Sequence, residues 1–150
     1  MELPKLVLIS LIAGGLTQVI KFSIQAMRGE FRWSNLQEYG GMPSAHTAFV
    51  VSLTTVVGLD QGWTSPVFAI SLIFSLIIIR DAIGLRQFIG LHGHVLNMLI
   101  RELPDREERK FPQRLAERLG HTPLQATVGG LIGLIVAILL YYWTPSIWKF

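Results

Sequence analysis

Two histidines in this sequence stand where a helix is expected to begin, a position that suits phosphate chemistry. The first ends the run Gly-Gly-Met-Pro-Ser-Ala-His over residues 40–46. The two glycines permit a tight loop with exposed backbone amides, and Ser44 is a favourable N-cap. Unpaired N–H groups and a partial positive charge at such a helix end suit a phosphate, and His46 could donate a proton to a leaving oxygen. A capped helix with an interfacial histidine is the simpler interpretation.

The second histidine lies in the run Arg-Leu-Gly-His-Thr-Pro-Leu-Gln over residues 118–125. This pattern again indicates a loop, a cap and a proline in the first helical turn. His121 is therefore expected just outside one helix, as His46 is expected just inside another. One histidine could act as a nucleophile and the other as an acid, although capping alone explains His121 about equally well.

Charged residues near the two histidines could hold a phosphate. Lys21 and Arg28 are separated by six residues at the end of the first apolar segment, and Arg80, Asp81 and Arg86 follow the third. An ionisable residue at membrane depth is a functional candidate by default. The simpler interpretations are that Lys21 extends to the membrane interface and that Asp81 pairs with an arginine.

Metal and thiol chemistry find little support in the sequence. The chain has no cysteine, which excludes disulfides, thiolate catalysis and cysteine-ligated zinc. His92 and His94 are two residues apart, so on a helix they face different directions, and no third ligand is evident. We therefore expect no metal and no other cofactor.

The elements that must position these residues are strongly apolar. The 150 residues are 51% apolar and 15% charged, whereas soluble domains are about 25% charged. This composition excludes a disordered chain, and the length fits a single domain over residues 1–150. A nucleic-acid-binding protein would rarely carry such long apolar segments, so we expect an integral membrane protein.

Four apolar segments predict an all-α helix bundle with about four main spans. A helix needs about 20 residues to cross the hydrocarbon core, so the shorter second and third segments should cross with polar ends tucked into protein. The N-terminal segment lacks the features of a signal peptide and is expected to be a retained span. The four segments are Leu6–Ile20 (extendable to Met27), Ala45–Leu59, Pro66–Ile79 (extendable to Leu85) and Leu124–Trp143.

The distribution of basic residues predicts the orientation in the membrane. Eight of the thirteen Lys and Arg residues lie between Arg80 and Arg118, and the turn over residues 60–65 has none. By the positive-inside rule, the basic loops are cytoplasmic and both termini lie on the other side.

Residues 91–120 are the one sizeable polar part of the chain. Apolar residues recur at helical spacing from Val95 to Leu103, which predicts an amphipathic helix that ends at Pro104. A second, short helix is expected over residues 112–119. We expect this amphipathic segment to lie on the cytoplasmic membrane surface.

Taken together, the motifs resemble those of the type 2 phosphatidic acid phosphatase and vanadium haloperoxidase superfamily. Its pattern has three parts: Lys-x6-Arg-Pro, Pro-Ser-Gly-His and Ser-Arg-x5-His-x3-Asp. Lys21 and Arg28 fit the first part with Gly29 in place of proline, and residues 43–46 fit the second with alanine in place of glycine. The intact runs Gly-Gly-Met-Pro-Ser-x-His and Leu-Gly-His-Thr-Pro-Leu are typical of the short divergent branch of bacterial and plastid membrane proteins. The resemblance covers nearly the whole chain.

The resemblance implies a phosphohistidine mechanism that needs no metal. His121 would attack phosphorus, and His46 would protonate the leaving alcohol or phosphate. Nearby backbone amides would help to hold the phosphoryl oxygens. The side chains expected to do so are Lys21, Arg28, Ser44, Arg80 and Arg86.

Two positions depart from the catalytic pattern of the superfamily. Gln125 stands four residues after His121, where the superfamily has aspartate, and Leu115 stands six residues before it, where the superfamily has arginine. A carboxylate holds the imidazole tautomer and stabilises the cation that forms on attack, whereas an amide orients the ring without supplying charge. Gln125 would then orient His121, and Asp81 or Glu117 could supply the charge through space.

The leading function is therefore a membrane phosphatase-like protein that hydrolyses a lipid phosphomonoester or diphosphate. The alternatives are a weak or inactive relative that binds anionic lipid or helps to assemble a complex, and a component of a small transporter or flippase. Expected partners are membrane lipids and a phosphorylated lipid, not nucleic acid, and a homo-oligomer or a larger membrane complex stays open. The expected location is a bacterial inner membrane or a thylakoid or plastid-type membrane, with the site on the cytoplasmic side.

Overall fold

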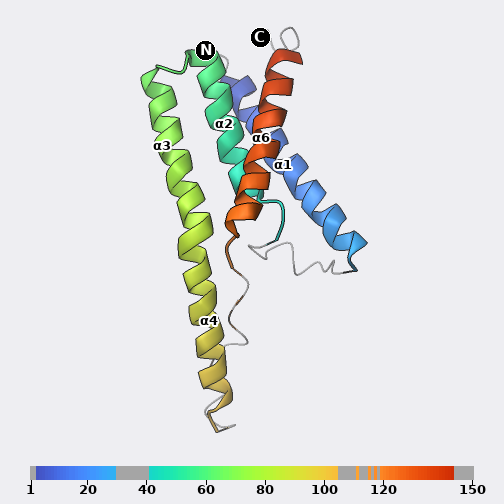
Figure 1. Ribbon diagram of the computed structural model, residues 1–150, viewed down its shortest axis with the longest axis vertical. Coiled ribbons are helices and arrows are strands. Elements are labelled where there is room, and N and C mark those ends of the chain that lie inside the picture. Colours follow the sequence, from blue (N-terminus) through green and yellow to red (C-terminus); the bar gives the residue numbers. More distant parts are fainter. Residues whose placement is uncertain are drawn as a thin grey trace.

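The protein is all-α, as the sequence predicts. The computed structural model describes residues 3–29, 41–104, 111, 115, 117 and 119–143, and no strand occurs among them. The helices are α1 (Leu3–Met27), α2 (Ala45–Gln61), α3 (Pro66–Arg80), the π-helical turn η2 (Asp81–Leu85), α4 (Arg86–Arg101) and α6 (Pro123–Trp143), shown in Figure 1.

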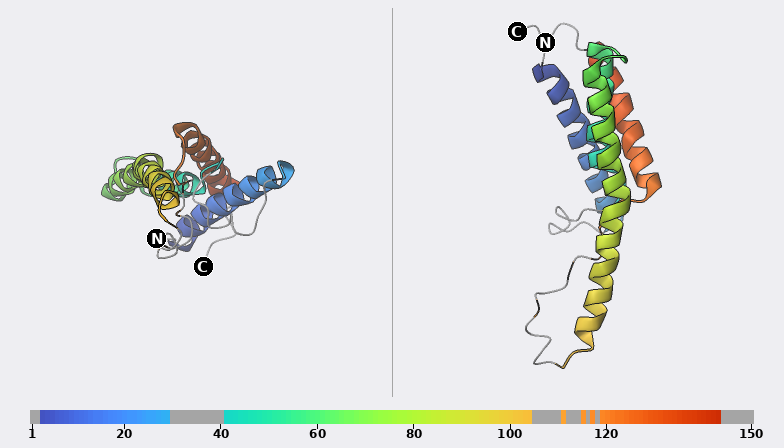
Figure 2. Two further views of the ribbon diagram at one scale, coloured as in Figure 1. Left: turned by 90° about the horizontal axis from the view of Figure 1, so that it is seen from below. Right: turned by 90° about the vertical axis from the view of Figure 1, so that its left-hand side faces the viewer.

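Helix α2 lies at the centre of the bundle, in contact with α1, α3 and α6 (Figures 1 and 2). Its 17 residues span about 25 Å at 1.5 Å per residue, which is short for a membrane helix. Its buried hydroxyl groups are bonded within protein: the Thr55 hydroxyl donates to the Val51 carbonyl at 2.8 Å, and the Thr54 and Ser75 hydroxyls lie 2.6 Å apart. Such bonds are what a polar helix needs where water is absent.

Three helical segments around α2 are long and apolar enough to cross a membrane. They are Lys5–Met27, Pro66–Arg101 and Pro123–Trp143. The long apolar helices that the sequence predicts are therefore confirmed, and the shorter α2 runs between them. The buried apolar cluster of the bundle contains Leu6, Ile9, Val56, Val57 and Ala137. It lies toward the end where α1 begins and α6 ends, so the opposite end is left for polar residues.

Helix α6 packs against α2 at backbone contact. A Cβ atom added at Gly129 would collide with the carbonyl oxygen of Ser44, and one added at Gly133 would collide with that of Ala48. The Gly129-x3-Gly133 spacing places both glycines on one face of the helix. This spacing permits close packing within the bundle, which brings the first turns of α2 and α6 together.

Helices α3, η2 and α4 form one continuous helix of 36 residues, Pro66–Arg101. Its length is about 54 Å, against a hydrocarbon core of about 30 Å, so α4 extends beyond the bundle (Figure 1). The amphipathic helix that the sequence predicts before Pro104 is found as α4, but it continues α3 and is not a separate surface helix. No proline interrupts the chain between Pro66 and Pro104, and the helix passes through Asp81–Leu85 by a π-helical turn instead of breaking.

The short helix expected over residues 112–119 is not found in the described part of that range. Leu115, Glu117 and Leu119 are not helical, and residues 112–114, 116 and 118 lie outside the described residues. Leu115 and Glu117 instead run alongside α4, to which their hydrogen bonds hold them.

The contact between α2 and α6 predicts the effect of one methyl group. Gly133→Ala should lower the thermal unfolding temperature in detergent, because the new Cβ meets a backbone oxygen that cannot move aside, and overpacking of this kind costs about 1–3 kcal/mol. The matched control is Gly130→Ala, whose Cβ would meet only the side chains of Thr47 and Val51 at 3.5 Å. Equal unfolding temperatures for the two variants would contradict the packing described here.

Candidate active site

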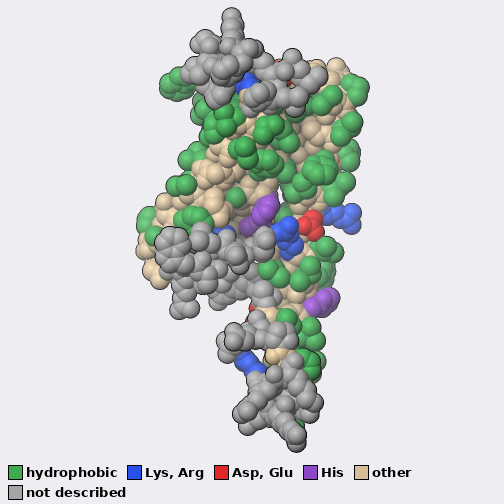
Figure 3. All heavy atoms as spheres, turned by 180° about the vertical axis from the view of Figure 1, so that it is seen from behind, with side chains coloured by type: hydrophobic (Ala, Val, Ile, Leu, Met, Phe, Trp, Pro, Cys, Tyr) green, Lys and Arg blue, Asp and Glu red, His purple; other side chains and the backbone are tan. Residues whose placement is uncertain are grey.

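Polar side chains gather at the end of the bundle where α1 ends and α2 and α6 begin. Lys21, Ser44 and His121 are all buried there. Figure 3 shows apolar side chains over the bundle, with histidine, basic and acidic side chains in a band at mid-height of this face. The structure thus brings together residues at or next to three helix ends, from segments that are far apart in the sequence.

The backbone of His121 is held by the long helix. Its N–H donates to the Ala82 carbonyl at 2.9 Å, and the Gln87 side-chain amide donates to the His121 carbonyl at 2.8 Å. Gly120 has φ +86°, and a Cβ there would lie 2.9 Å from the Gln87 nitrogen. Only glycine fits this approach, so Gly120 lets the chain pass close to Gln87 just before His121.

The His121 residue is 5% exposed, and its ring lies in a cationic environment. Among the described residues, no hydrogen-bond partner meets its buried Nδ1 atom. Burial lowers the pKa of His121, the charges of Lys21 and His46 lower it further, and the Gln125 side chain and Gly41 backbone partly oppose the shift. The folded protein therefore favours the neutral imidazole, which is the nucleophilic form.

Gln125 has a structural task of its own. The Thr122 N–H donates to the Gln125 Oε1 atom at 3.0 Å, and the Gln125 N–H donates to the Thr122 hydroxyl at 3.3 Å. This reciprocal pair is a capping box at the start of α6. The oxygen that would orient His121 thus also accepts a backbone hydrogen bond, and the orienting role of Gln125 stays a prediction.

Ser44 caps α2, as the sequence predicts. Its hydroxyl accepts from the Thr47 N–H at 3.4 Å and lies 3.0 Å from the Thr47 hydroxyl. Its own N–H donates to the Gln125 carbonyl at 3.2 Å, which ties the two helix starts together. The Ser44 side chain is fully buried and engaged in the cap, and phosphate binding by Ser44 stays a prediction.

His46 and Lys21 approach the site from α2 and α1. His46 lies exposed in the first turn of α2, and the charges of Arg86, Lys21 and Asp81 act on it. Lys21 is 5% exposed, and a Cβ added at Gly41 would lie 3.2 Å from its Cε atom. Gly41 has φ +93°, so glycine is favoured there both by the backbone and by the nearby lysine.

The remaining charged candidates are Asp81, Arg86, Arg28 and Arg80. Arg86 donates from Nε to Asp81 at 3.1 Å, within one turn of the π-helical segment, so the pairing of Asp81 with an arginine is observed. Asp81 therefore binds Arg86, and its predicted orienting role is untested. Arg28 and Arg80 are exposed at the ends of α1 and α3, and neither makes an ion pair with another described residue.

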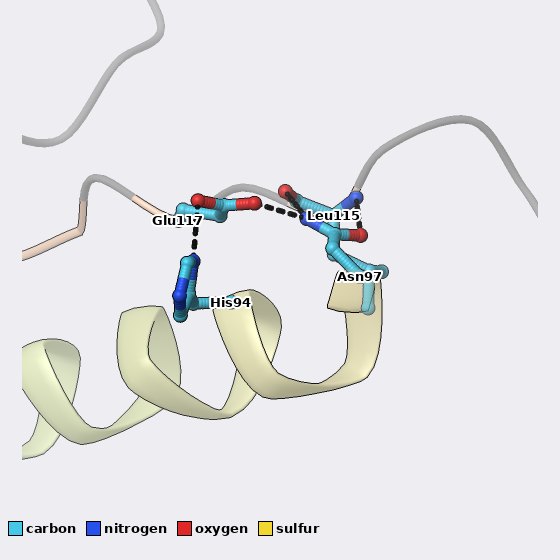
Figure 4. A network of polar contacts seen from close by, with 4 residues as sticks. All are labelled: His94, Asn97, Leu115 and Glu117. Atoms are coloured by element: carbon cyan, nitrogen blue, oxygen red, sulfur yellow. Dashed lines mark hydrogen bonds and ion pairs between the residues drawn. The ribbon is translucent and has the colours of Figure 1, made fainter. Parts of the chain in front are cut away.

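A polar network on α4 holds the segment that contains Leu115 and Glu117 (Figure 4). The Asn97 side chain exchanges hydrogen bonds of 2.9 and 3.0 Å with the Leu115 backbone and donates to Glu117 at 2.8 Å, and His94 Nδ1 lies 2.9 Å from Glu117. The hydrogen bonds from Asn97 and then His94 lower the pKa of Glu117. Glu117 is thus engaged on α4, and its contact is with His94 instead of His121.

Sequence reasoning did not predict that this network positions Leu115 and Glu117, or that Gln87 positions His121. A sequence signal exists: Gln87, Gly90, His94 and Asn97 recur at intervals of three or four residues, which defines one face of a helix. Gly90 lies on that face because a Cβ there would meet the Glu117 carbonyl. A face of polar and small residues on an otherwise apolar helix indicates that the backbone of another segment packs against that face.

The chain is similar to a known protein family and to a known membrane protein. The sequence profile described as the Divergent PAP2 family matches residues 4–136. The chain is also 37% identical over 144 residues to a protein of Bacillus subtilis (strain 168) described as "Uncharacterized membrane protein YuiD", a match that covers 89% of this chain and 91% of that protein. No solved structure matches the chain significantly.

The buried neutral His121 predicts a pH dependence of stability. Its folded pKa lies below the ordinary 6.5, so below about pH 6.5 the unfolded chain binds a proton at this residue that the folded chain does not. Stability should therefore fall as the pH is lowered from about 8 to about 5, and His121→Asn should reduce that fall. Thermal unfolding of both proteins across this range measures the difference. Parallel pH profiles would show that His121 titrates normally in the folded protein.

Proposed function

Because the chain belongs to the Divergent PAP2 family, we propose that this membrane protein binds phosphorylated lipid headgroups and hydrolyses a phosphomonoester or diphosphate through a phosphohistidine. The observation that carries the proposal is the placement of a buried His121 within electrostatic reach of Lys21 and His46. A nucleophile, a fixed cation and a second imidazole are the groups that phosphoryl transfer needs.

The proposed reaction has two steps. In the first, a neutral His121 nitrogen attacks phosphorus, the bond from phosphorus to the leaving oxygen breaks, and His46 gives that oxygen a proton. Because Nδ1 is buried, the attack comes from Nε2. In the second, His46 accepts a proton from water, the water oxygen attacks phosphorus, and the bond between phosphorus and nitrogen breaks. Phosphate leaves, and both histidines return to their starting forms.

Charge stabilisation comes from several elements. Lys21 supplies a buried ammonium group from α1, and Arg86 acts on the same region from the start of α4. The first turn of α2 contributes backbone amides and the positive end of its dipole. Arg28, Ser44 and Arg80 stay predicted phosphate-binding residues, and Arg28 and Arg80 are exposed.

The position of the site supports a lipid substrate. The site lies at one end of an apolar bundle whose long helices can cross a membrane, so a phosphate in it would sit near the level of lipid headgroups. The abundance of basic residues beyond α3 supports a cytoplasmic position for this end. A bacterial inner membrane or a plastid-type membrane is the proposed location.

A second function, binding of a phosphorylated lipid without turnover, is favoured by one observation. Among the described residues, no carboxylate contacts Nδ1 of His121, and the nearby amide of Gln125 is part of a capping box. The imidazolium that forms on attack would then lack a neighbouring negative charge. The same cations would still hold a phosphate, so the protein would act as a lipid-binding or assembly component.

Loss of the proposed nucleophile should abolish turnover. His121→Ala should release no phosphate from phosphatidate, phosphatidylglycerol phosphate or a polyprenyl diphosphate, because no phosphohistidine can form. The matched control is His92→Ala, which removes an exposed imidazole on α4 and should leave activity unchanged. Phosphate release by pure protein in detergent is the measurement. Full activity in the His121 variant would rule out the proposed mechanism.

Restoring the carboxylate separates the two functions. Gln125→Asp places a negative charge four residues after His121, and such a charge is worth about 10⁴ in turnover in the serine protease triad. We expect phosphate release to rise at least about tenfold, since the charge stabilises the cationic phosphohistidine. Gln125→Asn is the uncharged control and should not rise. If wild type and both variants bind phosphate but release none, the binding function replaces the hydrolytic one.

A further inference from the structure

A glutamine near the end of α1 carries an unused hydrogen-bond acceptor beside the candidate site. Gln25 lies one helical turn after Lys21, on the same face of α1. Its Oε1 atom is buried, and among the described residues it has no hydrogen-bond partner. A buried acceptor without a donor costs about 1–3 kcal/mol, so such a group needs an explanation.

Gly41 connects Gln25 to the site. A Cβ atom added at Gly41 would lie 3.2 Å from Cε of Lys21 and 3.7 Å from Nε2 of Gln25, so both side chains lie against the same glycine. The Gly41 backbone also acts on the His121 ring. Gln25 therefore belongs to the cluster that contains the buried cation and the buried imidazole.

The chemistry of this acceptor differs from that of its neighbours. Lys21 offers only donors, which match the oxygens of a phosphate. An ionised phosphate ester presents acceptors, so it leaves the Gln25 oxygen unsatisfied. A hydroxyl group in the alcohol part of the ligand is a donor that would satisfy this oxygen.

We propose that Gln25 is a ligand-binding residue that selects phosphate esters with a free hydroxyl group close to the phosphate. The inference rests on the proposed function, because it assumes that Lys21 and His121 hold the phosphate. It narrows the substrate class to headgroups of the hydroxyalkyl phosphate type. A simple packing role does not account for the residue, since leucine would fill similar space without a buried unpaired oxygen.

The test compares two small probes that differ by one hydroxyl group, 2-hydroxypropyl phosphate and n-propyl phosphate. Their affinities for the full-length protein in detergent can be measured by isothermal titration calorimetry. Wild type should bind the hydroxylated probe about three to ten times more tightly, the value of one hydrogen bond. Gln25→Leu should bind both probes equally, with the affinity for n-propyl phosphate retained. Gln18→Leu, two turns earlier on α1, is the matched control and should keep the preference.

The outcomes separate this inference from the proposed function. Equal binding of the two probes by wild type overturns the role of Gln25 and leaves the phosphate site in place, whatever the variants do. A preference that persists in Gln25→Leu also overturns it. If wild type binds neither probe, the phosphate site itself fails, and the inference fails with it.

Discussion

The candidate site depends on one backbone contact, the meeting of the first turns of α2 and α6. Two glycines on α6 leave no side chain between the helices, and the Ser44 N–H donates to the Gln125 carbonyl at 3.2 Å. This contact brings the chain around His46 and the chain around His121 to the same end of the bundle. Larger residues on that face of α6 would hold the first turns of α2 and α6 apart. The glycines are therefore needed both for the packing of the two helices and for the assembly of the site.

The position of His121 is also fixed by hydrogen bonds to the long helix that contains α3 and α4. The chain leaves the bundle along α4 and returns beside it, held by Asn97 and then by Gln87, before His121 donates its N–H to the Ala82 carbonyl. The continuous helix thus acts as a rigid support along which the returning segment is aligned. The polar network lies farther along α4 and aligns the segment that leads to His121. This explains why a small membrane protein extends a helix well beyond its bundle.

Much of the fold could be predicted because it is encoded locally. The helix bounds follow from long apolar runs, from Pro66 and Pro123 in first helical turns, and from the cap at Ser44. The straight passage from α3 into α4 could not be predicted in this way, since a polar Arg-Asp pair resembles a helix end and only the π-helical turn shows that the helix continues. In the site, the candidate residue types were evident, but their partners depend on tertiary structure. Gln125 resembled a weakened catalytic residue, and its capping box with Thr122 became clear only from the hydrogen bonds.

The central claim is that a phosphoryl group is transferred to His121. Its most direct test is to quench the reaction with alkali during turnover of a phosphorylated lipid and to locate the covalent phosphate by mass spectrometry. Alkali is used because phosphohistidine is stable under alkaline conditions. The account predicts phosphate on the His121 ring and on no other residue. Turnover with phosphate on a different side chain would contradict it, as would turnover in which His121 stays unmodified throughout a time course that resolves the first reaction cycle.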